Sequence, residues 1–87
     1  MLLSKYMNVG KVSLVIYDFE KVGDTLPIHV HGDDNNHFTV VAKGKLRAFG
    51  NGWEQIIEAG NVVDFEANDP HGFEALEDNS RIVNVVK

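Results

Sequence analysis

The four histidines of this 87-residue chain share a spacing that could bind a metal ion. Because alternate residues of a β-strand face the same side, His29 and His31 would project together. Turn-forming residues follow at 32–36, and a reversal there would bring His37 back beside the first pair on a neighbouring strand. His71 would then reach the site from a distant strand. Imidazole is a frequent ligand of transition metals, and its neutral form is available near pH 7.

Residues 23–44 resemble the first motif of the cupin superfamily, G-x5-H-x-H, a short spacer, E, x6-G. Gly23, His29, His31 and Gly44 stand at the matching positions. His37 stands where this motif has Glu, after a spacer one residue longer than usual. Some cupins use four histidines, so the replacement is compatible with a metal site.

Residues 60–75 resemble the second cupin motif, G-x5-P-x-G-x2-H-x3-N. Gly60 and His71 match it at the family spacing. Glu66, Asn68 and Ala75 replace the usual Pro, Gly and Asn. Asn68 is a mild departure, since Asn tolerates the left-handed backbone conformation that a turn glycine supplies.

The resemblance implies a fold and a set of ligands. It implies an all-β cupin double-stranded β-helix, a jelly-roll barrel, with residues 1–87 as one domain. It also implies that His29, His31, His37 and His71 bind one divalent transition metal, which would be Fe, Mn, Ni, Cu or Zn. Magnesium and calcium prefer oxygen ligands and are disfavoured.

The strand pattern agrees with that fold independently of the family. Short segments rich in β-branched and aromatic residues alternate with turn signals, and no segment keeps a helical period. The Asn51-Gly52 step is typical of a hairpin. The expected strands cover residues 12–19, 37–42, 45–49, 53–58, 61–66, 72–76 and 81–86. The segment before Gly10 could either extend a sheet across a dimer or fray.

Strand parity also identifies a candidate pocket lining. If His37 points inward, Thr39 and Val41 should do so as well, and the same holds for His71 and Phe73. Asn84 shares a face with apolar neighbours of the last expected strand. It could contact a substrate or be a satisfied structural residue.

Composition limits the partners. The net charge of −5 and the lack of a basic cluster argue against nucleic acid. No apolar run approaches the ~20 residues of a membrane span, and no apolar signal core follows the first residues, so we expect a cytoplasmic chain that does not bind membranes. A chain this short buries only roughly 60–65% of its unfolded surface, which favours a homodimer.

The leading functional hypothesis is a metal-dependent oxygenase-type cupin acting on a small chelating organic substrate. An all-histidine site leaves a divalent ion its full charge and strong Lewis acidity toward an enolate, catecholate or diketonate. The sequence identifies no further catalytic residue. One alternative is a cupin that binds a sugar or organic acid without turnover. Another is a metal-assisted isomerase, for which Asp64 and Glu66 are candidate acid-base groups only if they face inward.

Overall fold

The computed structural model describes residues 1–29, 37–65 and 69–86, which form nine strands and no helix. The strands are β1 (Leu2–Val9), β2 (Val12–Phe19), β3 (Thr25–His29), β4 (His37–Lys43), β5 (Lys45–Gly50), β6 (Trp53–Glu58), β7 (Val62–Asp64), β8 (His71–Ala75) and β9 (Ser80–Val86). The all-β prediction is confirmed. No helix in this part of the chain could span a membrane.

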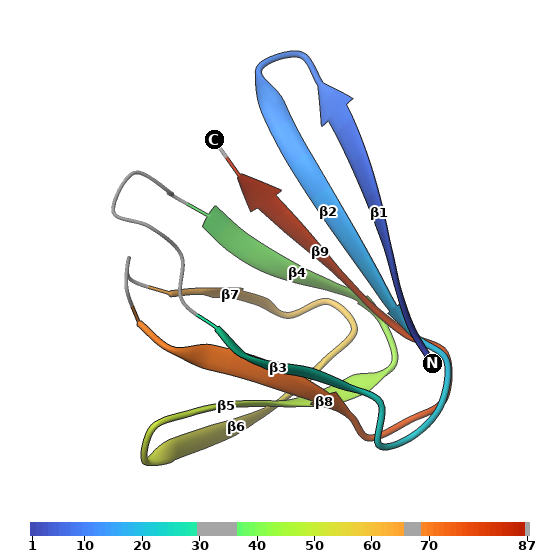
Figure 1. Cartoon of the computed structure of the whole chain (residues 1–87), viewed down its shortest axis with the longest axis vertical. Coiled ribbons are helices and arrows are strands. Elements are labelled where there is room, and N and C mark those ends of the chain that lie inside the picture. Colours follow the sequence, from blue (N-terminus) through green and yellow to red (C-terminus); the bar gives the residue numbers. More distant parts are fainter. Residues whose placement is uncertain (30–36, 66–68, 87) are drawn as a thin grey trace.

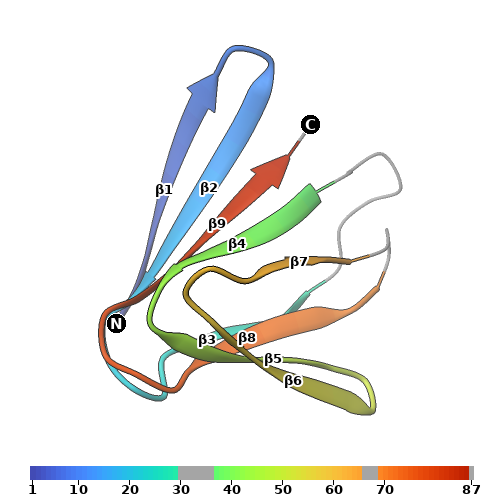
Figure 2. The ribbon, with the colours of Figure 1, turned by 180° about the vertical axis from the view of Figure 1, so that it is seen from behind.

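The strands build two antiparallel sheets that face each other. One has five strands in the order β1-β2-β9-β4-β7, and the other has four in the order β3-β8-β5-β6. Figures 1 and 2 show the two sheets as separate layers, with the β1–β2 hairpin extending beyond the shorter sheet. This is the jelly-roll arrangement that the sequence predicts.

The core lies between the two sheets and contains residues from both. Phe19 and Ile82 come from the five-stranded sheet, while Leu46, Ile57 and Phe73 come from the four-stranded sheet, and none of the five is more than 1% exposed. Along β5 and β9 the buried residues alternate with less buried ones, as expected for strands with one face against a core.

Gly44 makes the connection from one sheet to the other. It separates β4 from β5, its φ is +84°, and a Cβ atom there would lie 2.7 Å from the Cα atom of Ser80. A residue with a side chain would meet both a backbone penalty and a collision. The glycine that closes the first motif is therefore required by the crossing between the sheets.

Two expectations about strand neighbours need correction. β3 and β4 belong to different sheets, so the prediction that His37 returns on a strand neighbouring His29 is wrong. The neighbour of β3 is β8, the strand that begins at His71. The segment before Gly10 pairs with β2 of the same chain over its whole length. The β3–β8 pairing joins residues far apart in sequence, which local patterns do not specify, whereas β1 and β2 form a local hairpin.

Candidate functional site

The predicted metal ligands lie at strand ends on one side of the molecule. Figure 1 shows the end of β3 and the beginnings of β4 and β8 on the same side. His29 is the last residue of β3, His71 is the first of β8, and the register places these two opposite each other. His37 is the first residue of β4, opposite Val86. His31 lies outside the described residues.

His71 is held in one orientation. It is 1% exposed, and its Nδ1 lies 2.8 Å from the carbonyl oxygen of Asp69. Because a carbonyl oxygen only accepts, Nδ1 must carry the proton, and the lone pair of the neutral ring is on Nε2. Histidines that bind metals commonly donate their other ring nitrogen to a carbonyl in this way.

Aromatic rings fix the plane of the His71 ring. The Phe65 ring stacks on it with centroids 3.9 Å apart and planes 5° apart. Trp53 stacks on Phe65 at 6.0 Å, and Phe73 meets the edges of both Phe65 and His71 at about 6 Å. The imidazole therefore has little freedom to turn about its Cβ–Cγ bond.

Gly50 makes room for this stack. It lies opposite His71 in the β5–β8 register, and a Cβ atom there would be 2.5 Å from Cε2 of Trp53 and 2.6 Å from the carbonyl oxygen of Pro70. The indole fills the space that a side chain at position 50 would need. Sequence reasoning assigned no part in the site to Trp53 or Phe65. Phe65 stacks on His71 from the end of β7, and Trp53 stacks on Phe65 from β6, so both contacts depend on the tertiary structure.

The predicted pocket lining is buried between the sheets. Thr39 and Phe73 are 0% exposed, Val41 is 1% exposed and Asn84 is 3% exposed. Thr39 and Asn84 are register partners on β4 and β9, and the Thr39 hydroxyl donates to Oδ1 of Asn84 at 2.6 Å. The side-chain oxygen of Asn84 therefore already accepts a structural hydrogen bond.

Of the two candidate acid-base residues, the structure describes only Asp64. Asp64, the last residue of β7, is exposed, and Glu66 lies outside the described residues. Among the described residues, no group of three His, Cys, Asp or Glu could hold a metal ion. The four-histidine site, which includes His31, stays a prediction.

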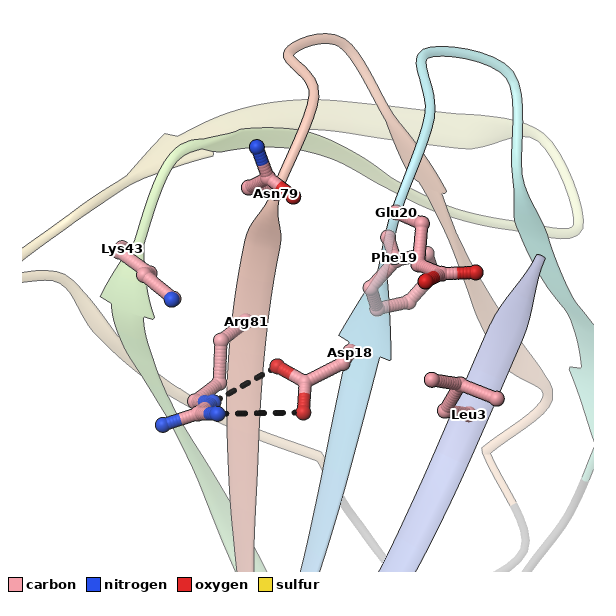
Figure 3. Close-up of a pocket in the computed structure, with 7 residues that line it drawn as sticks. All are labelled: Leu3, Asp18, Phe19, Glu20, Lys43, Asn79 and Arg81. Atoms are coloured by element: carbon pink, nitrogen blue, oxygen red, sulfur yellow. Dashed lines mark hydrogen bonds and ion pairs between the residues drawn. The ribbon is translucent and has the colours of Figure 1, made fainter.

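A cavity of about 200 Å³ lies at the opposite end of β4 from His37. Figure 3 shows its polar lining, in which Arg81 stands between Asp18 and Lys43. Arg81 donates to both carboxylate oxygens of Asp18, at 2.7 and 3.2 Å. These hydrogen bonds lower the pKa of Asp18 and raise the pKa of Arg81. Both groups thus stay charged at neutral pH, which suits an ion pair rather than proton transfer.

Comparison with known proteins identifies the class of protein. The Cupin domain family (Cupin_2) matches residues 15–86, and the chain belongs to this family. No curated protein matches the chain in sequence.

Solved structures share the fold at low sequence identity. An RmlC-like cupin protein of Desulfovibrio desulfuricans has a TM-score of 0.83 and 24% identity, covering 98% of this chain and 81% of that one. KdgF of a Halomonas species has a TM-score of 0.84 and 19% identity, covering 98% and 78%. The Cupin_2 domain of an XRE family transcriptional regulator of Enterobacter cloacae has a TM-score of 0.83 and 14% identity, covering 98% and 94%.

Proposed function

We propose that the chain is a metal-binding cupin domain in which His29, His31, His37 and His71 hold one divalent transition metal. The observation that carries the proposal is the state of His71, which is buried, oriented by stacking and fixed with its lone pair on Nε2. The Asp69 carbonyl would act as the outer partner that orients a ligating histidine. The register position of His29 opposite His71 supports the same site.

The donor set favours Fe, Mn, Ni, Cu or Zn, since imidazole suits these ions and not Mg²⁺ or Ca²⁺. Such an ion would supply Lewis acidity toward a chelating anionic substrate. The chain's own contribution is to hold the imidazole of His71 in place through its ring contacts with Phe65 and Phe73. We therefore propose an oxygenase-type cupin acting on a small enol, catechol or diketone.

A cupin that binds a small molecule without turnover is the second candidate. It is supported by the similarity of the chain to the Cupin_2 domain of a transcriptional regulator. The metal-assisted isomerase is a weaker candidate, because the exposed Asp64 cannot serve a buried centre as acid or base.

The first experiment measures metal content by elemental analysis, after reconstitution with each of the five candidate ions. We expect about one ion per chain, and we expect its loss in His71→Gln, which keeps a polar side chain of similar volume. Asp64→Asn is the control, because it removes an exposed carboxylate near the site and should leave the metal content unchanged. Circular dichroism checks that both variants fold. Metal content that is negligible, or equal in His71→Gln and wild type, would exclude the site.

A second experiment separates the two candidate functions. The loaded protein is mixed with a panel of enols, catechols and diketones, while oxygen uptake, product formation and melting temperature are followed together. Oxygen uptake with product supports the oxygenase. A rise in melting temperature without product supports the binding domain and rejects the enzyme.

A further inference from the structure

The cavity at the far end of β4 is separate from the predicted histidine site. His37 begins this strand and Lys43 ends it, and the length of the strand puts their Cα atoms about 20 Å apart. The cavity volume of about 200 Å³ equals that of roughly six or seven water molecules at ~30 Å³ each. A small organic molecule would fill it without contact with the predicted metal ligands.

The floor of the cavity is one row of side chains across four strands. The adjacent residues Phe19 and Ile82 are buried in the core, so the row lies on the outer face of the five-stranded sheet. Its members are register partners on β1, β2, β9 and β4, namely Leu3, Asp18, Arg81 and Lys43. The row is apolar at one end and positively charged at the other.

Two cationic groups stand side by side at the positive end. Lys43 is the register partner of Arg81, and like charges directly opposite each other destabilise a sheet. Asp18 accepts from Nε and Nη2 of Arg81, which leaves Nη1 without a hydrogen bond to any described residue. Lys43 forms no ion pair within the part of the chain that the structure describes. A carboxylate between the two side chains would accept from both and offset their repulsion.

An irregularity in β4 turns Lys43 toward the cavity. Val41 is buried on the inner face, and regular alternation would place Lys43 on that same face. The β4–β9 register shifts between these two residues, so Lys43 lies outward and exposed, opposite Arg81. A β-bulge commonly re-aims a side chain in this way beside a functional site.

The other half of the cavity carries two carboxylates and an apolar side chain. Figure 3 shows Asp18 and Glu20 on the side of Arg81 that is away from Lys43. Glu20 is 48% exposed, and its contact with the Met1 amino group is long, at 3.6 Å. Leu3 lies beside Asp18 and is 44% exposed. The cavity therefore has a positive half, a negative half and an apolar margin next to the negative half.

Hydrogen bonds between two turns hold the end of the cavity in place. The backbone N–H of Asn79 donates to the carbonyl oxygen of Glu20 at 3.1 Å, and the N–H of Val22 donates to Oδ1 of Asp78 at 2.9 Å. These bonds join the turn after β2 to the turn before β9. Because the lining is held before any ligand arrives, binding would cost less ordering entropy.

We propose that this cavity binds a free α-amino acid with a small aliphatic side chain. The ligand carboxylate lies between Lys43 and Arg81, and its ammonium group faces Asp18 and Glu20. Its aliphatic side chain lies against Leu3. The four charged side chains sum to zero, as do the charges of a dipolar amino acid, and such complementarity selects it over a simple anion or cation. Binding here does not require the metal site.

The test uses L-valine and two molecules that each lack one of its charges. Isovalerate lacks the ammonium group, isobutylamine lacks the carboxylate, and each is added to the isotope-labelled chain while amide chemical shifts are followed by NMR. Valine should shift the amides of Lys43, Asn79 and Arg81 and saturate at millimolar concentration. Each partial molecule should bind about tenfold more weakly or worse, because it leaves one charged half of the cavity unpaired.

Substitutions then test each half of the cavity. Lys43→Met removes the cation without an ion pair and should weaken valine binding about tenfold or more. Lys11→Met is the matched control, since it removes an exposed lysine from the β1–β2 turn at the other end of β2 and should leave the affinity unchanged. Glu20→Gln should weaken valine binding but not the binding of isovalerate. Circular dichroism verifies that each variant folds.

Several results would overturn the amino-acid site. Valine that causes no saturable shift would exclude it, and inorganic phosphate that shifts the same amides equally well would indicate a simple anion site. Valine shifts centred on His71 and Gly72 would place the ligand at the histidine site instead. An equal loss of affinity in Lys11→Met and Lys43→Met would show that only the net charge of the protein matters.

Discussion

Both faces of β9 carry apolar residues, but their surroundings differ. On the inner face, Ile82 and Asn84 are 0% and 3% exposed beneath the four-stranded sheet. On the outer face, Val83 and Val85 have no second layer among the described residues of the chain. A strand that is apolar on both faces is normally buried on both. Within the described residues, only the inner face of β9 is covered by a second layer.

The largest expected effect on stability comes from shortening a valine on the inner face of β4, compared with the same change on its outer face. Val41→Ala should destabilise the protein by about 2–3 kcal/mol, because it removes two methyl groups from a site that is 1% exposed and leaves a cavity. Val40→Ala makes the same change on the outer face and should cost about 0.5 kcal/mol in dilute solution.

Urea denaturation at several protein concentrations measures both variants. The loss of stability in Val41→Ala should not depend on protein concentration. The loss in Val40→Ala would grow with concentration only if a second molecule covers the outer face. Equal and constant costs at the two positions would show that the chain itself covers the outer face.

An intermediate effect is expected for the buried hydrogen bond on the inner face. Thr39→Val keeps the side-chain shape but leaves the Asn84 oxygen without its donor, and should cost about 1–2 kcal/mol. The matched control is Thr25→Val, where an exposed hydroxyl donates to the Gly23 carbonyl oxygen at 2.9 Å and water can replace it. Thermal denaturation should separate the two variants. A Thr39→Val protein as stable as wild type would show that this pair does not stabilise the inner face.

The smallest effect is expected at the ion pair on the outer face. Asp18 and Arg81 are 35% and 40% exposed, so Asp18→Asn should lower the melting temperature by only about 2 °C at neutral pH. Arg81 lowers the pKa of Asp18 below its ordinary 3.8 in the folded protein. The ion pair therefore stabilises the fold above pH 3.8. This contribution disappears as the pH falls through the lower pKa that Asp18 has in the folded protein.

Melting curves across the acid range measure this contribution. The difference between wild type and Asp18→Asn should close below pH 3.8. A difference that persists at lower pH would mean that Asp18→Asn destabilises the protein through a change in side-chain packing and not through the loss of the charge.

Much of the fold is predictable from local patterns. The strand at 12–19 and the Asn51-Gly52 hairpin between β5 and β6 are confirmed by the structure. The strand expected at 61–66 is shorter, because β7 ends at Asp64 and the next residue, Phe65, stacks on His71. Local periodicity indicates where strands lie, but it does not state which distant strand each one pairs with.

The candidate site was predictable only in part. The second motif singled out His71, and the structure buries that residue and orients its ring. The aromatic stack could not be inferred, since Phe65 meets His71, and Trp53 meets Phe65, through tertiary contacts. Asn84 was ambiguous in the sequence, and the structure gives it a hydrogen bond with Thr39. The prediction for His31 lies outside the described residues.

The central place of β9 has a consequence for the order of folding. Hairpins β1–β2 and β5–β6 join near neighbours in sequence and can form within microseconds. β9 must instead enter between β2 and β4, and the Val15–Asn84 pairing closes most of the chain into a loop. Such closure is slow for topologies rich in distant contacts. While β9 is unpaired, the facing edges of β2 and β4 are open to pairing with other chains, so slow closure lengthens the time during which the protein can aggregate.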